Sequence, residues 1–356
     1  MAVLALATLP VPLSAGDPCA SPASLSPRPA WIKSAIWLPP PVSRILAVDS
    51  ALNRLVLYGS DGKGTILTDK LLPGLLALSG DRILLKLVGM NAQSFDAKTL
   101  EDFRPHAVLK EIKTSLGPLA AVYQWLGVDH SLLATGLVVN DKLPKGFQPG
   151  LFRFSAVEEN SKTAQLVKAI EAWDYYVLGY QYLTSSGGST GYFLDMDGGT
   201  ARLFEVPLGG AARELTKAMP PEAVKVPAVN ATLNGPKDAP PLFEYLARQQ
   251  MATGIYGGPD GNIYLLVRVP AANGINDWWL FRISVKGDGA VLGKAHLPSH
   301  ARHLSIVVSP DTFYLFERGA VNPYGGQDIE TMIAVPASVL ERAPLQGINV
   351  CSTMRQ

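Results

Sequence analysis

The sequence predicts an all-β fold in which small antiparallel sheets repeat around a central axis. Three observations support this prediction: a tight turn that leads into an apolar strand, recurrence of that pattern along the chain, and sparse helical signals. The 356 residues are 47% hydrophobic and only 17% charged, with 33 glycines and 28 prolines. A chain of this length can bury about 75% of its unfolded surface in one large domain.

The clearest hairpin is centred on the turn "PDGN" at residues 259–262. Its proline fixes φ at the first corner, and Asp, Gly and Asn tolerate the positive φ that a chain reversal needs. Residues 263–269 after the turn are β-branched, aromatic and aliphatic, and residues 252–256 before it are also apolar. This composition is typical of a pair of buried strands.

Related turns recur between apolar segments. They lie at residues 49–53, 79–81, 127–131 and 309–312, with a weaker copy at 173–175. About six hairpins at spacings of roughly 40–60 residues indicate a radial β repeat, here a six-bladed β-propeller. A two-layer β-sandwich is the alternative. The acids Asp49, Asp129, Asp260 and Asp311 recur at these turns and are interpreted as backbone-bonding turn residues.

The two ends of the chain are expected to meet in the last blade. Residues 38–48 align without a gap with residues 297–307, and in both an apolar strand follows a Leu-Pro pair. The N-terminal strand around Ile36 and Trp37 then precedes any complete hairpin. We expect it to supply the outer strand of the last blade, beside residues 329–335, because such closure removes an exposed sheet edge.

Two segments carry helical patterns. Residues 238–249 begin with "DAPP" and resemble a short capped helix. Residues 161–173 place Leu166, Ile170 and Trp173 on one face and predict a second helix.

The N-terminal residues resemble an export signal. Residues 1–16 are apolar and end in small residues, which is typical of a secretory signal peptide, although no Lys or Arg precedes them. A buried N-terminal strand is the alternative. The expected organisation is a signal peptide at 1–16, a Pro/Ser-rich spacer at 17–30, the propeller at 31–339 and a C-terminal tail at 340–356. The protein is therefore expected in the periplasm or outside the cell, with no stable membrane insertion.

The chain has two cysteines, Cys19 and Cys351. If the N-terminal strand joins the last blade, both cysteines hang from that blade, and an exported chain meets oxidising conditions. A Cys19–Cys351 disulfide is expected, with two unrelated thiols in mobile tails as the alternative.

The stretch "GPDGNIYLLV" resembles the inner hairpin of six-bladed propellers of the NHL and TolB-like kind, including the streptogramin lyase type. The resemblance implies the same architecture for residues 31–339. Such propellers include lactonases, lyases, peptide-binding modules and assembly platforms, so the resemblance implies no single function.

Candidate ligand-binding residues gather on one expected face of the ring. We call this the loop face: it carries the crossovers between blades and the loops that follow the second strand of each blade. The candidates are His300, His303, Arg268, Glu317 and Arg318. Imidazole is a common metal ligand, which makes His300 and His303, with the nearby His296, weak candidates for a metal site. Arginine offers a planar fork suited to carboxylates, but such residues often pair with each other instead.

Two functions follow from these observations. The first is a non-enzymatic exported propeller that binds a protein, peptide or glycan on its loop face, without a cofactor. The alternative is a lyase or lactone hydrolase that uses a divalent cation at the channel mouth. The net charge of +1 and the lack of basic clusters argue against a nucleic-acid partner.

Overall fold

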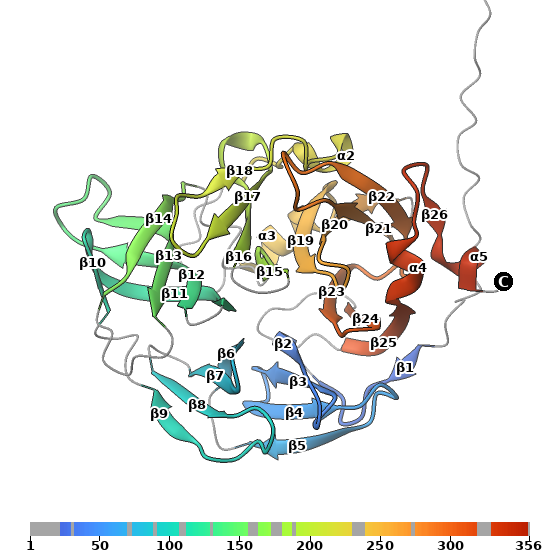
Figure 1. Ribbon diagram of the computed structural model, residues 1–356, viewed down its shortest axis with the longest axis horizontal. Coiled ribbons are helices and arrows are strands. Elements are labelled where there is room, and N and C mark those ends of the chain that lie inside the picture. Colours follow the sequence, from blue (N-terminus) through green and yellow to red (C-terminus); the bar gives the residue numbers. More distant parts are fainter. Residues whose placement is uncertain are drawn as a thin grey trace, which may run out of the picture.

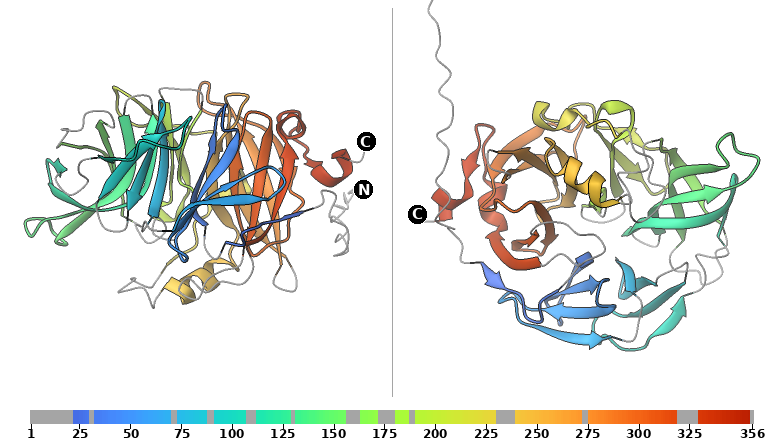
Figure 2. Two further views of the ribbon diagram at one scale, coloured as in Figure 1. Left: turned by 90° about the horizontal axis from the view of Figure 1, so that it is seen from below. Right: turned by 180° about the vertical axis from the view of Figure 1, so that it is seen from behind.

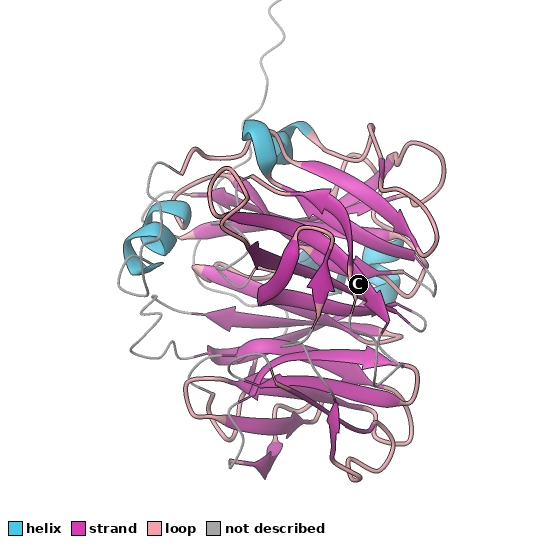
Figure 3. Ribbon diagram, turned by 90° about the vertical axis from the view of Figure 1, so that its left-hand side faces the viewer, coloured by secondary structure: helices cyan, strands magenta, loops and turns pink. Residues whose placement is uncertain are grey.

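The computed structural model is a ring of six antiparallel sheets around a central axis (Figure 1). It describes residues 22–29, 32–69, 73–87, 91–106, 112–128, 131–155, 163–171, 180–186, 190–229, 239–271, 275–318 and 329–354. Strands dominate the described chain, and the short helices lie outside the sheets (Figure 3). The fold is a six-bladed β-propeller, as the sequence predicts.

The first three blades follow the chain from residue 32 to residue 169. Blade 1 consists of β2 (Ile32–Leu38), β3 (Arg44–Asp49), β4 (Arg54–Tyr58) and β5 (Gly64–Thr68). Blade 2 consists of β6 (Pro73–Ser79), β7 (Arg82–Leu87), β8 (Ala92–Asp96) and β9 (Arg104–His106). Blade 3 consists of β10 (Lys113–Thr114), β11 (Gly117–Val128), β12 (Ser131–Val139), β13 (Phe147–Ser155) and β14 (Gln165–Ala169).

The last three blades carry the helices. Blade 4 consists of β15 (Leu183–Ser185), β16 (Thr190–Asp195), β17 (Arg202–Pro207) and β18 (Arg213–Glu214), with the 3₁₀ turn η2 (Asp197–Gly199) between its middle strands. The crossover to blade 5 contains α2 (Pro221–Val224) and α3 (Ala239–Leu246). Blade 5 consists of β19 (Met251–Gly257), β20 (Ile263–Pro270), β21 (Asn276–Ile283) and β22 (Val291–His296), with β26 (Ile348–Asn349) outside them. Blade 6 consists of β23 (His303–Val308), β24 (Thr312–Arg318), β25 (Ile329–Pro336) and β1 (Ala23–Ser24); α4 (Ala337–Glu341) and α5 (Val350–Met354) follow near the C-terminus.

Four of the predicted hairpins form the two innermost strands of a blade. The "PDGN" turn joins β19 to β20, and the turns at 79–81, 127–131 and 309–312 join β6 to β7, β11 to β12 and β23 to β24. The nearly continuous apolar sequence of these strands explains the arrangement, because both faces of an inner strand pack against neighbouring blades. The weaker copy at 173–175 lies outside the described residues.

In blade 1 the predicted inner hairpin is displaced outward by one strand. The turn at 49–53 joins β3 to β4, the second and third strands, and the innermost strand is β2, which contains Ile36 and Trp37. The two aligned Leu-Pro pairs therefore follow strands at different positions in their blades. The first ends β2, the innermost strand of blade 1, and the second follows β22, the fourth strand of blade 5. A pattern of apolar strands and turns does not encode which strand is innermost.

The ring is closed by an N-terminal strand, but by a different one from the strand expected. β1 pairs antiparallel with β25 through Ala23–Met332 and Ser24–Thr331, and Figure 1 shows it at the outer edge of blade 6. Part of the expected spacer thus belongs to the propeller. At the other terminus, β26 pairs parallel with β22, so residues of the expected C-terminal tail add a fifth strand to blade 5.

One of the two expected helices is present. α3 falls inside residues 238–249, and in the left view of Figure 2 it projects from one face of the disc. Residues 165–169, expected to be helical, form β14 instead, the outermost strand of blade 3. This segment is half-buried at the edge of the sheet, and its hydrogen bonds to β13 favour a strand over the helix that its apolar spacing predicted.

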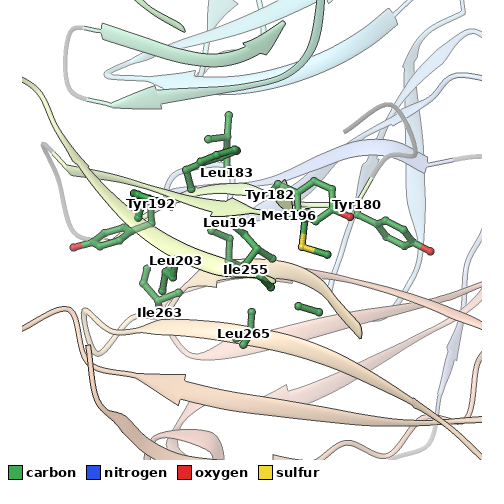
Figure 4. Close-up of a cluster of buried hydrophobic side chains, with 14 of the residues drawn as sticks. Tyr180, Tyr182, Leu183, Tyr192, Leu194, Met196, Leu203, Ile255, Ile263 and Leu265 are labelled. Carbon is green, nitrogen blue, oxygen red and sulfur yellow. The ribbon is translucent and has the colours of Figure 1, made fainter. Parts of the chain in front are cut away.

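Apolar layers between neighbouring blades form the core. In one of them Leu194, Leu203, Ile255, Ile263 and Leu265 lie between the sheets of blades 4 and 5 (Figure 4). Inner strands also approach each other through backbone. A Cβ on Gly127 of β11 would lie 2.0 Å from the Leu78 carbonyl oxygen of β6, and a Cβ on Gly257 would lie 1.8 Å from that of Ser185. Glycine is therefore required at both contacts.

The expected signal peptide and disulfide both involve N-terminal residues that the structure does not describe, so they stay predictions. Residues 1–21, with the expected signal peptide and Cys19, lie outside the described residues. Cys351 lies half-buried in α5. Among the described helices, none is long and apolar enough to cross a membrane.

Candidate functional site: the central channel

A cavity of about 280 Å³ lies between the innermost strands of blades 1 to 4. Its wall is made by residues 33–36 of β2, 75–78 of β6, 122–127 of β11, and Tyr180, Gln181 and Ser185 beside β15. Polar side chains such as Lys33, Gln124 and Gln181 stand among the apolar ones in this wall. Preformed cavities with a few well-placed polar groups are typical ligand sites. Among the lining residues that the structure describes, none is acidic or histidine.

β-Bulges shape the inner wall. The register of the inner strand with its neighbour shifts at Lys33 in β2, at Gly74 in β6, at Tyr123 in β11 and at Thr253 in β19. A bulge redirects a side chain and increases the local twist, and bulges are frequent next to binding sites. In β2 the bulge places a lysine in the wall of the channel.

Two lysines lie near the loop-face ends of strands in neighbouring blades, Lys33 in the cavity wall and Lys86 on β7 next to that wall. Lys33 is the second residue of β2, which starts at the loop face, and Lys86 lies near the end of β7, which finishes there. Water reaches Lys33, yet surrounding protein desolvates its ammonium group and lowers its pKa. Desolvation, and then the positive charge of Lys33, lower the pKa of Lys86 to about 8. Such shifts mark functional sites more often than chance.

The opposite wall is held by a glutamine. The Gln124 side chain donates to the carbonyl oxygen of Tyr180 and accepts from the backbone N–H of Tyr182, 3.0 Å away. Both bonds are buried and connect β11 of blade 3 to the segment that enters β15 of blade 4. They fix the backbone on both sides of Gln181, which lines the cavity. The ring of Tyr180 extends to one side of the apolar layer (Figure 4).

Arg268 and His303, two of the predicted residues, lie behind Tyr180. Arg268 has no exposed surface; it donates to the Tyr180 hydroxyl (3.3 Å), to the Gln249 carbonyl (3.2 Å) and to the Leu246 carbonyl. It thereby binds the C-terminal end of α3 and supports Tyr180 instead of facing solvent. His303 is 4% exposed, with its ring centroid 6.5 Å from that of Tyr180.

Glu317 is also engaged within the fold. Its carboxylate accepts hydrogen bonds from the hydroxyls of Ser299 (2.6 Å) and Thr331. These bonds join the crossover before blade 6 to β24 and β25. Arg318 ends β24, where its backbone pairs with those of His303 and Ile329; its side chain is outside the description.

His296 and His300 meet at a different place, on the outer part of blade 5. Asp277 Oδ1 lies 3.3 Å from His296 Nε2 and 3.4 Å from His300 Nδ1. Nδ1 of His296 lies 3.4 Å from the Asn349 side-chain nitrogen, next to β26. The structure thus brings His296 and His300 together but separates them from His303. The four predicted ligand residues with described side chains, His300, His303, Arg268 and Glu317, do not converge on one point.

The alternative function calls for a set of side chains that can hold a divalent cation. Within the described ranges, no group of three or more His, Cys, Asp or Glu side chains could hold a metal ion. We therefore derive no catalytic step through a cation.

Sequence reasoning missed Lys33 and Lys86. Each lies inside an apolar strand, "IKSAIWL" and "RILLKL". A single charged residue within a strand that is otherwise core is the signal that could have identified them, because a charge is costly to bury in such a position.

Large apolar side chains are exposed on the loop face. Leu52 in the β3–β4 turn, Val139 at the end of β12, Tyr245 on α3 and Ile275 before β21 have exposed fractions of 37–48%. These four come from blades 1, 3 and 5 and from the crossover helix. Other exposed apolar side chains, such as Ile66 on β5, lie elsewhere on the molecule.

Comparisons with known proteins support the fold and nothing finer. No family model and no curated protein matches the sequence. Among solved structures, a gluconolactonase from Xanthomonas campestris is 11% identical with a TM-score of 0.50, covering 88% of this chain and 91% of that one. A structural-genomics target with a proposed gluconolactonase assignment is 12% identical with a TM-score of 0.52, covering 89% and 93%. The virginiamycin B lyase of Staphylococcus aureus is 10% identical with a TM-score of 0.44, covering 88% and 97%. At these identities the likeness is one of architecture: the chain is a six-bladed β-propeller.

Proposed function

We propose that the protein is a binding propeller that holds a protein, peptide or glycan on its loop face, with one group of the ligand inserted into the central cavity. The observation that carries this proposal is the preformed cavity of about 280 Å³, lined by four blades and fixed by Gln124. A cavity with a wall already held in place lowers the ordering cost of binding.

The surface around the cavity favours a protein or peptide over a glycan. Leu52, Val139, Tyr245 and Ile275 offer apolar contact area on the same face. Interfaces use such side chains as anchors, while the polar rim around them contributes mainly complementarity.

The test places a photo-crosslinking residue at Leu52 or Ile275 in the protein expressed in its own host. Cross-linked partners are identified by mass spectrometry, purified and titrated against the propeller. We expect Leu52→Asp and Ile275→Asp together to weaken the identified complex about tenfold or more, as for loss of interface anchors. Ile66→Asp on β5, a side chain of similar exposure away from the loop face, is the matched control. Equal cross-linking at Ile66 and Leu52, or a dissociation constant that the double variant does not change, contradicts the proposal.

We also propose that the protein is exported to the periplasm or beyond, on the strength of the apolar segment at residues 1–16. Fractionation of the host followed by N-terminal sequencing tests this. A mature chain starting near residue 17 outside the cytoplasm is expected, and an unprocessed cytoplasmic chain overturns it.

A further inference from the structure

We propose that the loop-face end of the central cavity binds a compact oxyanion group (a carboxylate, sulfate or phosphate), held by Lys33 and Lys86. The inference deepens the proposed function, because it names the chemical group that enters the cavity. It depends on the proposed function only for the source of that group.

The placement of the two lysines is the first argument. Lys33 lines the cavity at a bulge of β2. Lys86 lies on β7 opposite Leu75, which is itself in the cavity wall. The charge of Lys33 acts on Lys86, so the two ammonium groups share one region. Lys33 therefore lies in the cavity wall, and Lys86 lies on the neighbouring blade, on the strand next to that wall.

The charge balance is the second argument. Among the described residues, Lys33 has no hydrogen-bond or ion-pair partner, and no acidic residue lines the cavity. Asp49 lies near the start of β2, where its backbone pairs with that of Ile32, but its carboxylate forms an ion pair with Arg54 at 3.1 Å. The Lys86 ammonium donates to the Leu87 carbonyl oxygen at 3.3 Å. Like charges in a partly desolvated place repel strongly, so an anion between them is favoured.

A neutral donor completes the site. The Ser34 side chain lines the cavity next to Lys33, and its oxygen accepts the backbone N–H of Leu76 (3.1 Å). This bond fixes the oxygen and leaves the hydroxyl hydrogen to donate. Two ammonium groups and a hydroxyl match the several acceptor oxygens of an oxyanion, and charge-assisted bonds of this kind are the strong ones.

The test titrates the full chain with inorganic phosphate, sulfate and acetate by calorimetry and thermal melting, at constant ionic strength set with sodium chloride. We expect at least one of the three to bind and to raise the melting temperature above that in chloride alone. Lys33→Met is expected to weaken binding about tenfold or more, and Lys33→Met with Lys86→Met to abolish it.

The controls separate the site from general charge effects. Lys63→Met removes an exposed lysine outside the cavity and should leave the affinity unchanged. Lys33→Arg keeps the charge and should restore most of the binding that Lys33→Met loses. Melting of each variant without anion shows that it folds. The inference is overturned if none of the three anions exceeds chloride, or if the double variant binds as the unmodified protein does.

The source of the anion is decided with the partner found by cross-linking. Free anions that bind through the lysines, with no loop-face partner, support the anion site and remove the partner function. A partner whose affinity is unchanged by Lys33→Met supports the partner function and overturns the anion inference. A peptide from the partner that binds only with its carboxylate free, and not as the amide, identifies the partner as the source.

Discussion

The indole ring of Trp37 stacks on the ring of Tyr314, with centroids 5.8 Å apart and planes 13° from parallel. Trp37 belongs to the innermost strand of blade 1 and Tyr314 to blade 6, so this stack lies across the seam where the ring closes. The seam therefore has two parts: this aromatic contact near the axis and the β1–β25 pairing at the outer edge.

We expect Trp37→Ala to lower the free energy of unfolding by about 3 kcal/mol, because the large ring leaves a gap that Tyr314 cannot fill alone. Trp37→Phe keeps a ring at the seam and should lose much less. Urea unfolding followed by circular dichroism measures both variants. An alanine variant within about 0.5 kcal/mol of the unmodified protein would show that the stack does not stabilise the seam.

Leu25 follows the closing strand directly and is 5% exposed in the apolar layer with Tyr58, Phe316 and Met332. We expect Leu25→Ala to destabilise the protein by about 3 kcal/mol, since it removes buried apolar surface from the outer part of the seam. Leu345→Ala is the matched control, because Leu345 is 59% exposed. If the two variants melt together, residues 22–29 do not hold the ring closed.

Lys86 gives a pH dependence with a defined sign. Its pKa is about 8 in the folded protein, against an ordinary value of 10.5, so the unfolded state binds more protons between these values. Stability contributed by this group therefore rises with pH from about 8 to about 10.5 and is flat below. The facing charge is Lys33, whose pKa is lowered as well.

The measurement is the unfolding free energy of the unmodified protein minus that of Lys86→Met across this range. The subtraction removes buried tyrosines such as Tyr192, whose pKa burial raises to about 12 and which act in the opposite direction above pH 10. A difference that is constant with pH would mean that Lys86 titrates normally. Oxyanion binding should weaken over the same range, because it needs the charged amines.

The Cys19–Cys351 disulfide stays a prediction with support from the fold. β1 brings residue 23 to β25, and α4 follows β25 and packs on α5, which contains Cys351. Non-reducing peptide mapping of the exported protein should recover the two cysteines as one linked peptide. Reduction, or Cys351→Ser, should cost up to about 5 kcal/mol on the chain-entropy model of a very long loop. Free alkylation of both cysteines in the unreduced native protein would exclude the bridge.

Local turn chemistry was enough to predict most of the architecture. The "PDGN" turn needs Gly261 at a φ of 77°, and its Asp260 carboxylate accepts from the backbone N–H of Asn262 at 3.1 Å, as expected of a turn acid. Such turns depend only on neighbouring residues, so they can be identified from sequence. The position of a strand within its blade depends on contacts between blades, which explains the error of one strand at β2.

The closing strand and the channel could not be predicted in the same way. β1 is an Ala-Ser pair without β propensity, and it is a strand only because β25 offers it an unpaired edge. Arg268 was expected at the channel mouth because it ends a second strand. Instead its side chain is buried and donates to the Leu246 and Gln249 carbonyl groups and to the Tyr180 hydroxyl. Lys33 lies in the cavity wall because β2 has a bulge at this residue, and no local sequence pattern predicts that bulge.

β26 runs along the outside of blade 5, against the outermost strand β22, so the C-terminal end of the described chain sits on the rim of the disc (Figure 1). A reporter or a solid support joined at this end would extend sideways, in the plane of the ring. Both faces of the disc, the loop face included, would stay clear of the attachment.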